Sequence, residues 1–154
     1  MRIADLFEGK RKYYFHASTM ALANGEILRP SGRMHIGEAA ERFLETHRPP
    51  NFLSRQKAVF MVGSVDDVWE SGAAGSIVYR VVPLGRVQTH DAAWIGEIES
   101  WWRQPGDGDT TKIEYMAANY WWGEPHPQGT VWEYLTEQAR IVDFVTDLDD
   151  HEID

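Results

Sequence analysis

Residues 13–18 read YYFHAS, and GEILRP follows at 25–30. Aromatic residues favour the half-buried surface of a sheet, so this run predicts a strand over 13–16. His16 lies where the strand opens into a loop. Functional side chains are often found at such positions, because the strand is rigid and the loop is accessible. His16 is therefore a candidate site residue. The alternative is a structural histidine that is satisfied by a backbone carbonyl.

Hydrophobic spacing defines the elements on either side of this strand. Apolar residues recur at helical spacing from Ile36 to His47, which predicts an amphipathic helix that ends before Pro49. Strands are expected at 58–62, 76–82, 130–136 and 139–145, short extended pieces at 26–29 and 84–87, short helical turns within 1–12 and after Ser64, and helices at 91–104 and 110–122. Because strands and helices come in segregated runs, the pattern predicts an α+β fold and not a doubly wound parallel sheet. No repeat or linker divides the chain, so we expect one domain over 1–154.

Composition limits the classes of function. The chain has 154 residues, 7 Trp, no Cys and a formal net charge of −9. The absence of cysteine excludes disulfides, thiolate metal sites and a cysteine nucleophile, and it suits a reducing cytoplasm. The negative charge argues against broad contact with a nucleic-acid backbone, which requires a basic surface. A small-molecule site, or docking onto a basic protein, is compatible with this charge.

Neither end of the chain predicts a membrane or secretion signal. No apolar run approaches the ~20 residues that cross a bilayer. Residues 1–8, MRIADLFE, contain acidic side chains and no long apolar segment, so they do not resemble a secretory signal. Residues 147–154, DLDDHEID, are acidic and are expected to fray in solvent. We therefore expect a cytoplasmic protein with no membrane partner.

Two further residues are candidates for chemistry. Glu133 lies within VWEYL at 131–135, and a carboxylate among such residues is costly to bury unless it is paired or hydrogen-bonded. Its alternative is a place on the solvent face of an edge strand, and Glu137 is a less buried substitute. Phe60 lies in the apolar run AVFMV at 58–62 and, taken alone, is explained as a core residue.

Other chemistries have little support in the sequence. The 6 histidines show no HxH or HExxH spacing, so no metal site is expected. There is no GxSxG nucleophile elbow and no phosphate-binding loop of the GxxxxGK[ST] type.

Several short segments together resemble the ADP-ribosyltransferase fold family. The segments YFHAS at 14–18 and GEIL at 25–28 are similar to the YHGT…G..L.P opening of the rifampin ADP-ribosyltransferases. The middle of that family is similar to AVFMV at 58–62, DDVW at 66–69 and VYRVVPLG at 78–85. The pair EYL at 133–135 and ARIV at 139–142 resembles the glutamate-bearing strand and hairpin of the poly-ADP-ribose polymerase branch. The resemblance covers roughly 13–145.

The resemblance implies two small, mainly antiparallel sheets with an NAD cleft between them. It implies a catalytic trio of His16, Phe60 and Glu133, with His16 on a ribose hydroxyl and Phe60 stacking on nicotinamide. Ala17 and Ser18 would help to hold NAD. Phe60 lacks the hydroxyl of the family's usual tyrosine. The rifampin-modifying relatives use an aspartate elsewhere, so Asp91 is an alternative to Glu133 as the catalytic acid.

The implied function is an NAD-dependent mono-ADP-ribosyltransferase, a toxin or a modification enzyme, with NAD as its substrate. Its acceptor is expected to be a protein or a small molecule rather than a nucleic acid. One alternative is a non-enzymatic acidic binding or inhibitor protein that retains the fold. Another is an RNA 2′-phosphotransferase-like enzyme, whose basic site would use Arg48, Arg55 and Arg80.

Five tryptophans in the segment 91–123 are either helix-packing residues or a target-recognition surface.

Overall fold

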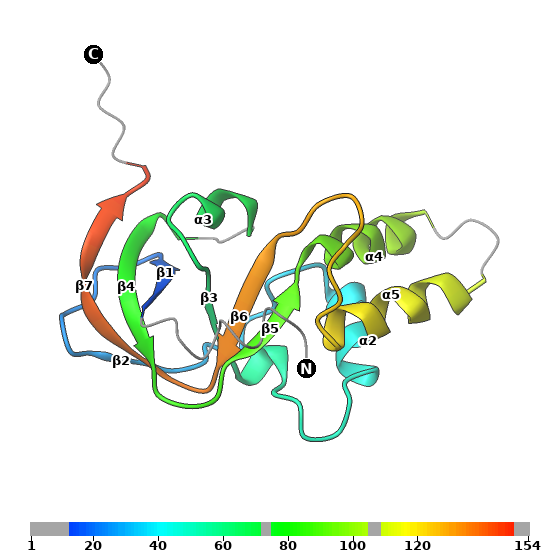
Figure 1. Cartoon of the computed structure of the whole chain (residues 1–154), viewed down its shortest axis with the longest axis horizontal. Helices are drawn as coiled ribbons and strands as arrows, with labels where there is room; N and C mark the ends of the chain where they lie inside the picture. Colours follow the sequence, from blue (N-terminus) through cyan, green and yellow to red (C-terminus); the bar gives the residue numbers. More distant parts are fainter. Residues whose placement is uncertain (1–12, 72–74, 105–108, 150–154) are drawn as a thin grey trace, which may run out of the picture.

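The strands and the longer helices form two distinct parts of one molecule (Figure 1). The structure is a computed structural model that describes residues 13–71, 75–104 and 109–149. The strands are β1 Tyr14–Ser18, β2 Ile27–Leu28, β3 Val59–Met61, β4 Ile77–Pro83, β5 Gln88–Asp91, β6 Trp132–Thr136 and β7 Ala139–Asp147. The helices are α2 Glu38–Thr46, the 3₁₀ turn η1 Arg55–Lys57, α3 Asp67–Glu70, α4 Ala93–Arg103 and α5 Thr111–Trp121. The expected α+β class is confirmed.

The strands form two small sheets whose pairs are all antiparallel. The first has the order β1-β4-β7-β2, and the second has the order β3-β6-β5. The sheets meet where β1 passes β3. There, Phe15 and Val62 exchange two backbone hydrogen bonds, each of 2.9 Å. This contact places the end of β1 directly beside β3, so residues from both sheets can line one site.

One hydrophobic core lies between the sheets. It combines Tyr14, Val59, Met61, Tyr79, Val81, Tyr134, Ala139 and Ile141, which come from strands of both sheets. Tyr79 and Val81 are two residues apart, so they point to the same face of β4. Val78 points to the other face, where it joins a small cluster with Val62 and Val68. β4 is therefore buried on both faces around Val78 and Tyr79, whereas Arg80 further along the strand is partly exposed.

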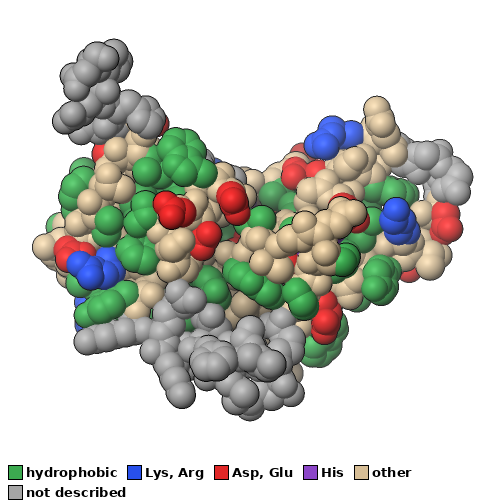
Figure 2. All heavy atoms as spheres, turned by 45° about the horizontal axis from the view of Figure 1, so that its top comes forward, with side chains coloured by type: hydrophobic (Ala, Val, Ile, Leu, Met, Phe, Trp, Pro, Cys, Tyr) green, Lys and Arg blue, Asp and Glu red, His purple; other side chains and the backbone are tan. Residues whose placement is uncertain are grey.

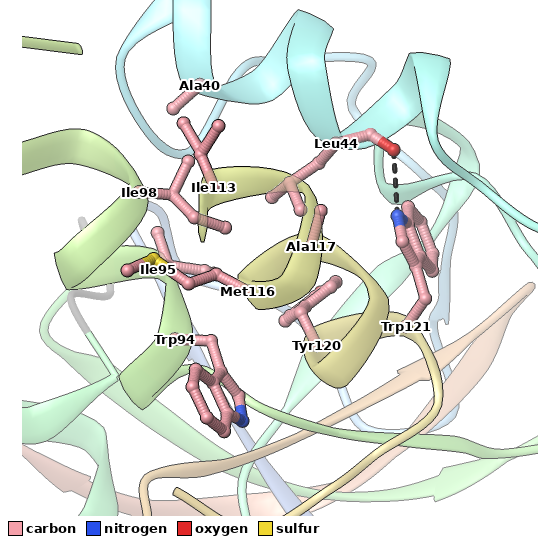
Figure 3. Packing of buried hydrophobic residues seen from close by; sticks show 10 residues of the cluster. All are labelled: Ala40, Leu44, Trp94, Ile95, Ile98, Ile113, Met116, Ala117, Tyr120 and Trp121. Carbon is pink, nitrogen blue, oxygen red and sulfur yellow. Dashed lines mark hydrogen bonds between the residues drawn. The ribbon is translucent and has the colours of Figure 1, made fainter. Parts of the chain in front are cut away.

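A second core holds the helices together. Helices α2, α4 and α5 bury Ala40, Leu44, Trp94, Ile95, Ile98, Ile113, Met116, Ala117, Tyr120 and Trp121 (Figure 3). The Trp121 indole N–H donates to the Leu44 carbonyl at 2.8 Å. This bond satisfies a buried polar group and joins α5 to α2.

The sequence prediction was wrong at the start of α4. Residues 88–91 form strand β5, and the helix begins at Ala93 instead of Asp91. The strand reads QTHD and has no apolar pattern of its own, but it pairs along its whole length with β6. Tertiary pairing therefore overrides the weak local preference.

The two ends of the chain were also the subject of expectations. The helical turn expected within 1–12 lies outside the described residues. At the other end, β7 continues to Asp147, and the Leu148 N–H bonds the Ser76 carbonyl at 2.9 Å. The first residues of the expected frayed tail are therefore bound to the sheet, and 150–154 lie outside the described ranges.

None of the helices in the described ranges is long and apolar enough to cross a lipid bilayer. On the face drawn in Figure 2, acidic side chains are spread over both parts of the molecule. Lys and Arg side chains of the described residues stand apart from one another there and form no broad patch.

Candidate active site

A cavity of about 560 Å³ lies where the two sheets meet. It is lined by the end of β1, by β3, by Glu133 of β6, by parts of the 28–36 loop and by the start of α4. Its volume falls within the range of ordinary small-molecule sites. The expected site residues His16, Ala17, Ser18, Phe60 and Glu133 all contribute to its lining.

His16 reaches from the first sheet to the second. Its imidazole Nδ1 lies 2.8 Å from the carbonyl oxygen of Phe60. Because a carbonyl can only accept, Nδ1 carries the proton and Nε2 keeps a free lone pair while the ring is neutral. Burial lowers the pKa of His16 from its ordinary 6.5, an effect that the hydrogen bond to Phe60 partly offsets. His16 is thus both a backbone-bonded histidine and a cavity residue that can accept a hydrogen bond from a ligand hydroxyl.

Ala17 and Ser18 continue the cavity wall beyond His16. The Ser18 hydroxyl donates to the Met20 carbonyl at 2.7 Å and accepts from the Met20 N–H at 3.1 Å. Its proton is therefore used within the turn, and Ser18 can meet a ligand only as an acceptor. Gly75 passes so close that a Cβ there would lie 2.3 Å from the Ser18 carbonyl carbon. The end of β1 is thus held tightly by the chain around it.

Phe60 contacts two side chains in the cavity. The His35 ring lies 4.1 Å from the Phe60 ring, and the Arg55 guanidinium carbon lies 5.0 Å from it. Partial burial, together with the charge of Arg55, lowers the pKa of His35 to about 4. His35 is therefore neutral at physiological pH, and it lies on an exposed loop that can give way to a ligand. A flat ligand that stacked on this side of Phe60 would take the place of His35.

Glu133 lies at the floor of the cavity in the central strand of its sheet, and it is only 5 % exposed. The alternative of a solvent-facing edge position is therefore wrong. Its Oε1 accepts hydrogen bonds from Arg55 Nη1 at 2.6 Å and from the Tyr120 hydroxyl at 2.5 Å. Arg55 Nη1 also donates to the Tyr120 oxygen. On its other side, Arg55 Nε donates to Glu41 Oε1 at 2.7 Å.

This buried cluster has an uneven charge. Arg55 contributes one positive charge, whereas Glu41 and Glu133 are two carboxylates, and all three are nearly inaccessible to solvent. Burial acts to lower the pKa of Arg55, but electrostatic interactions with Tyr120, Glu133 and Glu41 outweigh it, so that the pKa is raised. Glu41 Oε2 is buried and has no hydrogen-bond partner among the described residues. The floor of the cavity is thus suited to a ligand that develops positive charge.

Asp91, the alternative catalytic acid, lies elsewhere. Its Oδ1 accepts from the backbone N–H groups of Ala93 at 3.0 Å and Val131 at 2.8 Å, and its Oδ2 accepts from that of His126 at 2.7 Å. It joins the start of α4 to the loop before β6, and the described lining of the cavity does not include it. Glu137, the other substitute, is exposed in the turn between β6 and β7.

The three arginines proposed for an RNA site do not come together. Arg48 pairs with Glu45, and Arg80 pairs with Asp143 on the first sheet. Of the three, Arg55 alone contributes to the cavity lining. The arrangement gives no support to a phosphate site built from this set.

The tryptophans of 91–123 differ in how deeply they are buried. Trp94 and Trp121 are buried in the helical core, and Trp101 packs against it. Trp102 and Trp122 are 40 % and 60 % exposed, respectively. Helix packing therefore explains three of the five.

Sequence reasoning missed the residues that surround Glu133. Glu41 lies three positions before buried Leu44 and therefore on the same side of its helix, although a carboxylate ordinarily favours solvent. Tyr120 lies in the helical stretch expected at 110–122, where its spacing indicates only packing. Arg55 is named from the sequence only for a basic RNA site, because nothing in its polar loop segment indicates burial.

Among the described residues, no group of three His, Asp or Glu side chains is placed to hold a metal ion.

A scan against protein-family models finds no match to this chain, and a search of curated proteins finds no significant similarity. The site is therefore interpreted from its own geometry.

Proposed function

We propose that this protein is an NAD-dependent mono-ADP-ribosyltransferase. The observation that supports the proposal is that His16, Phe60 and Glu133 line one cavity, although more than a hundred residues separate the first from the last. The class of fold, with two antiparallel sheets that meet at this cavity, agrees with the resemblance in the sequence. The acceptor is expected to be a protein or a small molecule, since the net charge of −9 disfavours a nucleic acid.

Each of the three residues has a role in this reaction. Neutral His16 accepts a hydrogen bond from a ribose hydroxyl at Nε2. Phe60 offers an aromatic face to the nicotinamide ring once His35 has moved aside. Glu133 places a carboxylate near the ribose, where positive charge develops in the transition state.

The reaction is a substitution at the anomeric carbon of the ribose. The C–N bond to nicotinamide breaks, and its electron pair returns to the ring nitrogen, which becomes neutral. The ribose carbon passes through an oxocarbenium-like state that the carboxylate of Glu133 stabilises. The acceptor then forms the new bond to that carbon and loses its proton to solvent.

The test is turnover of labelled NAD. Purified protein, incubated with NAD carrying a label on the adenylate and with a cell extract, is expected to release nicotinamide and to label an acceptor. Glu133→Gln should abolish both signals, because the neutral amide cannot stabilise the developing charge. Glu137→Gln is the matched control, since Glu137 lies four residues further along the same hairpin and is exposed.

A wild-type protein that neither binds NAD nor releases nicotinamide would contradict the proposal. In that case, retention of a binding partner by Glu133→Gln and His16→Ala in a pull-down would favour the acidic binding protein instead.

A further inference from the structure

We propose that Tyr120 and Arg55 are positioning residues for Glu133, so that helix α5 belongs to the reaction machinery. This inference rests on the proposed ADP-ribosyl transfer, in which Glu133 acts on the ribose. It gives a role in the reaction to helix α5, which lies within the tryptophan-rich segment 91–123.

The first support is the geometry around one oxygen. Arg55 Nη1 and the Tyr120 hydroxyl both donate to Oε1 of Glu133, at 2.6 and 2.5 Å. Because Nη1 also donates to the Tyr120 oxygen, the three groups form a closed set. The described hydrogen bonds of the Glu133 carboxylate all go to Oε1, and Glu133 lines the cavity, so Oε2 is the oxygen left for the substrate. The carboxylate is therefore held in place through Oε1, and Oε2 can interact with the ribose.

The second support is that both donors keep their protons. Burial raises the pKa of Tyr120 well above 10, so its hydroxyl stays neutral and remains a donor. The guanidinium of Arg55 carries a permanent charge and a fixed planar arrangement of N–H groups. Neither group changes its state across the pH range in which an enzyme normally works.

The third support is that the positioning groups are themselves fixed. Tyr120 is fully buried, and its ring is stacked on His90 at 4.6 Å with 20° between the planes. The ion pair with Glu41 holds Arg55 from the opposite side. A rigid second layer of this kind is what keeps a reacting carboxylate within the narrow range of productive geometry.

The experiment compares Tyr120→Phe with Tyr115→Phe. Both residues lie on α5, but Tyr115 is 65 % exposed. It takes no part in the described hydrogen bonds around Glu133. Initial rates of nicotinamide release from NAD give kcat and KM, and circular dichroism gives the folded fraction. For Tyr120→Phe, kcat per folded molecule is expected to fall about tenfold or more while KM for NAD changes less than about twofold. Tyr115→Phe is expected to match wild type.

Arg55→Lys is the second variant, in case the first fails to fold. A lysine keeps the charge but cannot bond Glu41 and Glu133 in the same fixed arrangement. We therefore expect the same loss in kcat with little change in KM. Arg42→Lys, on the exposed side of α2, is its control.

The outcomes separate the two proposals. Wild type that turns over NAD, with Tyr120→Phe lowering only the melting temperature and leaving kcat intact, would show that Tyr120 is purely structural. An inactive wild type would instead overturn the transferase itself, and the positioning role with it.

Discussion

His16 and Phe60 belong to different sheets, yet the imidazole of one is bound to the backbone carbonyl of the other at 2.8 Å. The hydrogen bond lies in the wall of the cavity, next to the paired backbones of Phe15 and Val62. It fixes the orientation of the ring and also the spacing of the two sheets. Any change at His16 therefore has a structural effect as well as an effect on binding.

His16→Ala should lower both stability and affinity for NAD. It leaves the Phe60 carbonyl without its partner in a partly buried place, at a cost of about 1–3 kcal/mol in the free energy of unfolding. Loss of a ribose contact should weaken NAD binding about tenfold, as measured by calorimetry. His47→Ala is the control, because His47 makes the same kind of bond, to Phe43 at 2.9 Å, on an exposed helix end. Equal losses in the two variants would contradict the special role of His16.

Gly75→Ala should destabilise the end of β1. The added Cβ would lie 2.3 Å from the backbone of Ser18, so the strand must shift. We expect a loss of about 1–3 kcal/mol in urea unfolding, typical of overpacking. Gly96→Ala should instead be neutral or stabilising by up to about 1 kcal/mol, because Gly96 lies in helix α4 with open space around it. If both variants have the same effect on stability, the close approach of Gly75 to the Ser18 backbone is wrong.

Arg55→Met should be the most damaging single change in the cavity floor. It leaves Glu41 and Glu133 buried without their shared cation, which costs about 3–5 kcal/mol when one partner of a buried pair is removed. Arg42→Met removes an exposed pair with Glu38 and should cost less than about 1 kcal/mol. Chemical unfolding of the two variants at neutral pH measures the difference. Similar small losses would mean that the cluster is open to water.

Stability should fall in mild acid. Burial lowers the pKa of His16, and burial together with Arg55 lowers that of His35 to about 4, whereas both have pKa 6.5 in the unfolded chain. Between the folded-state and unfolded-state pKa values, the unfolded chain therefore binds more protons than the folded chain. The contribution of the two histidines to the free energy of unfolding is complete above pH 6.5 and is lost as pH falls toward about 4.

The measurement is urea unfolding at several pH values across this window. His35→Asn should show a shallower loss of stability than wild type, because one of the two titrating groups is gone. His47→Asn, which changes a histidine at an exposed helix end, is the control variant. If stability depends on pH in His35→Asn as it does in wild type, the lowered pKa of His35 is wrong.

The predictable part of the fold lies where local pattern and tertiary structure agree. The runs at 58–62, 76–82, 130–136 and 139–145 are apolar or alternating, and each forms a strand within a few residues of its expected bounds. β5 could not be found in this way, since its residues QTHD are polar and only pairing with β6 makes them a strand.

The candidate site was predictable to a similar degree. His16 and Glu133 stood out because a strand end and a carboxylate in an apolar run are locally unusual. Arg55 and Tyr120 did not, because their role depends on long-range packing that joins positions 78 and 13 residues from Glu133. Glu41 and Leu44 lie on the same side of one helix, but a carboxylate ordinarily favours solvent, so the sequence alone does not indicate that Glu41 is buried.

The polar cluster around Glu133 and Arg55 draws on both helices and sheets, which has a consequence for shortening the chain. Glu41 comes from α2 and Tyr120 from α5, while His16, Phe60 and Glu133 come from the sheets. A shortened chain that kept both sheets and lacked these helices would retain every residue of the expected trio. It would also expose Arg55 and Glu133 to water and release the carboxylate from its orientation. A minimal version of this protein must therefore include its helices, or supply another hydroxyl donor in the place of Tyr120.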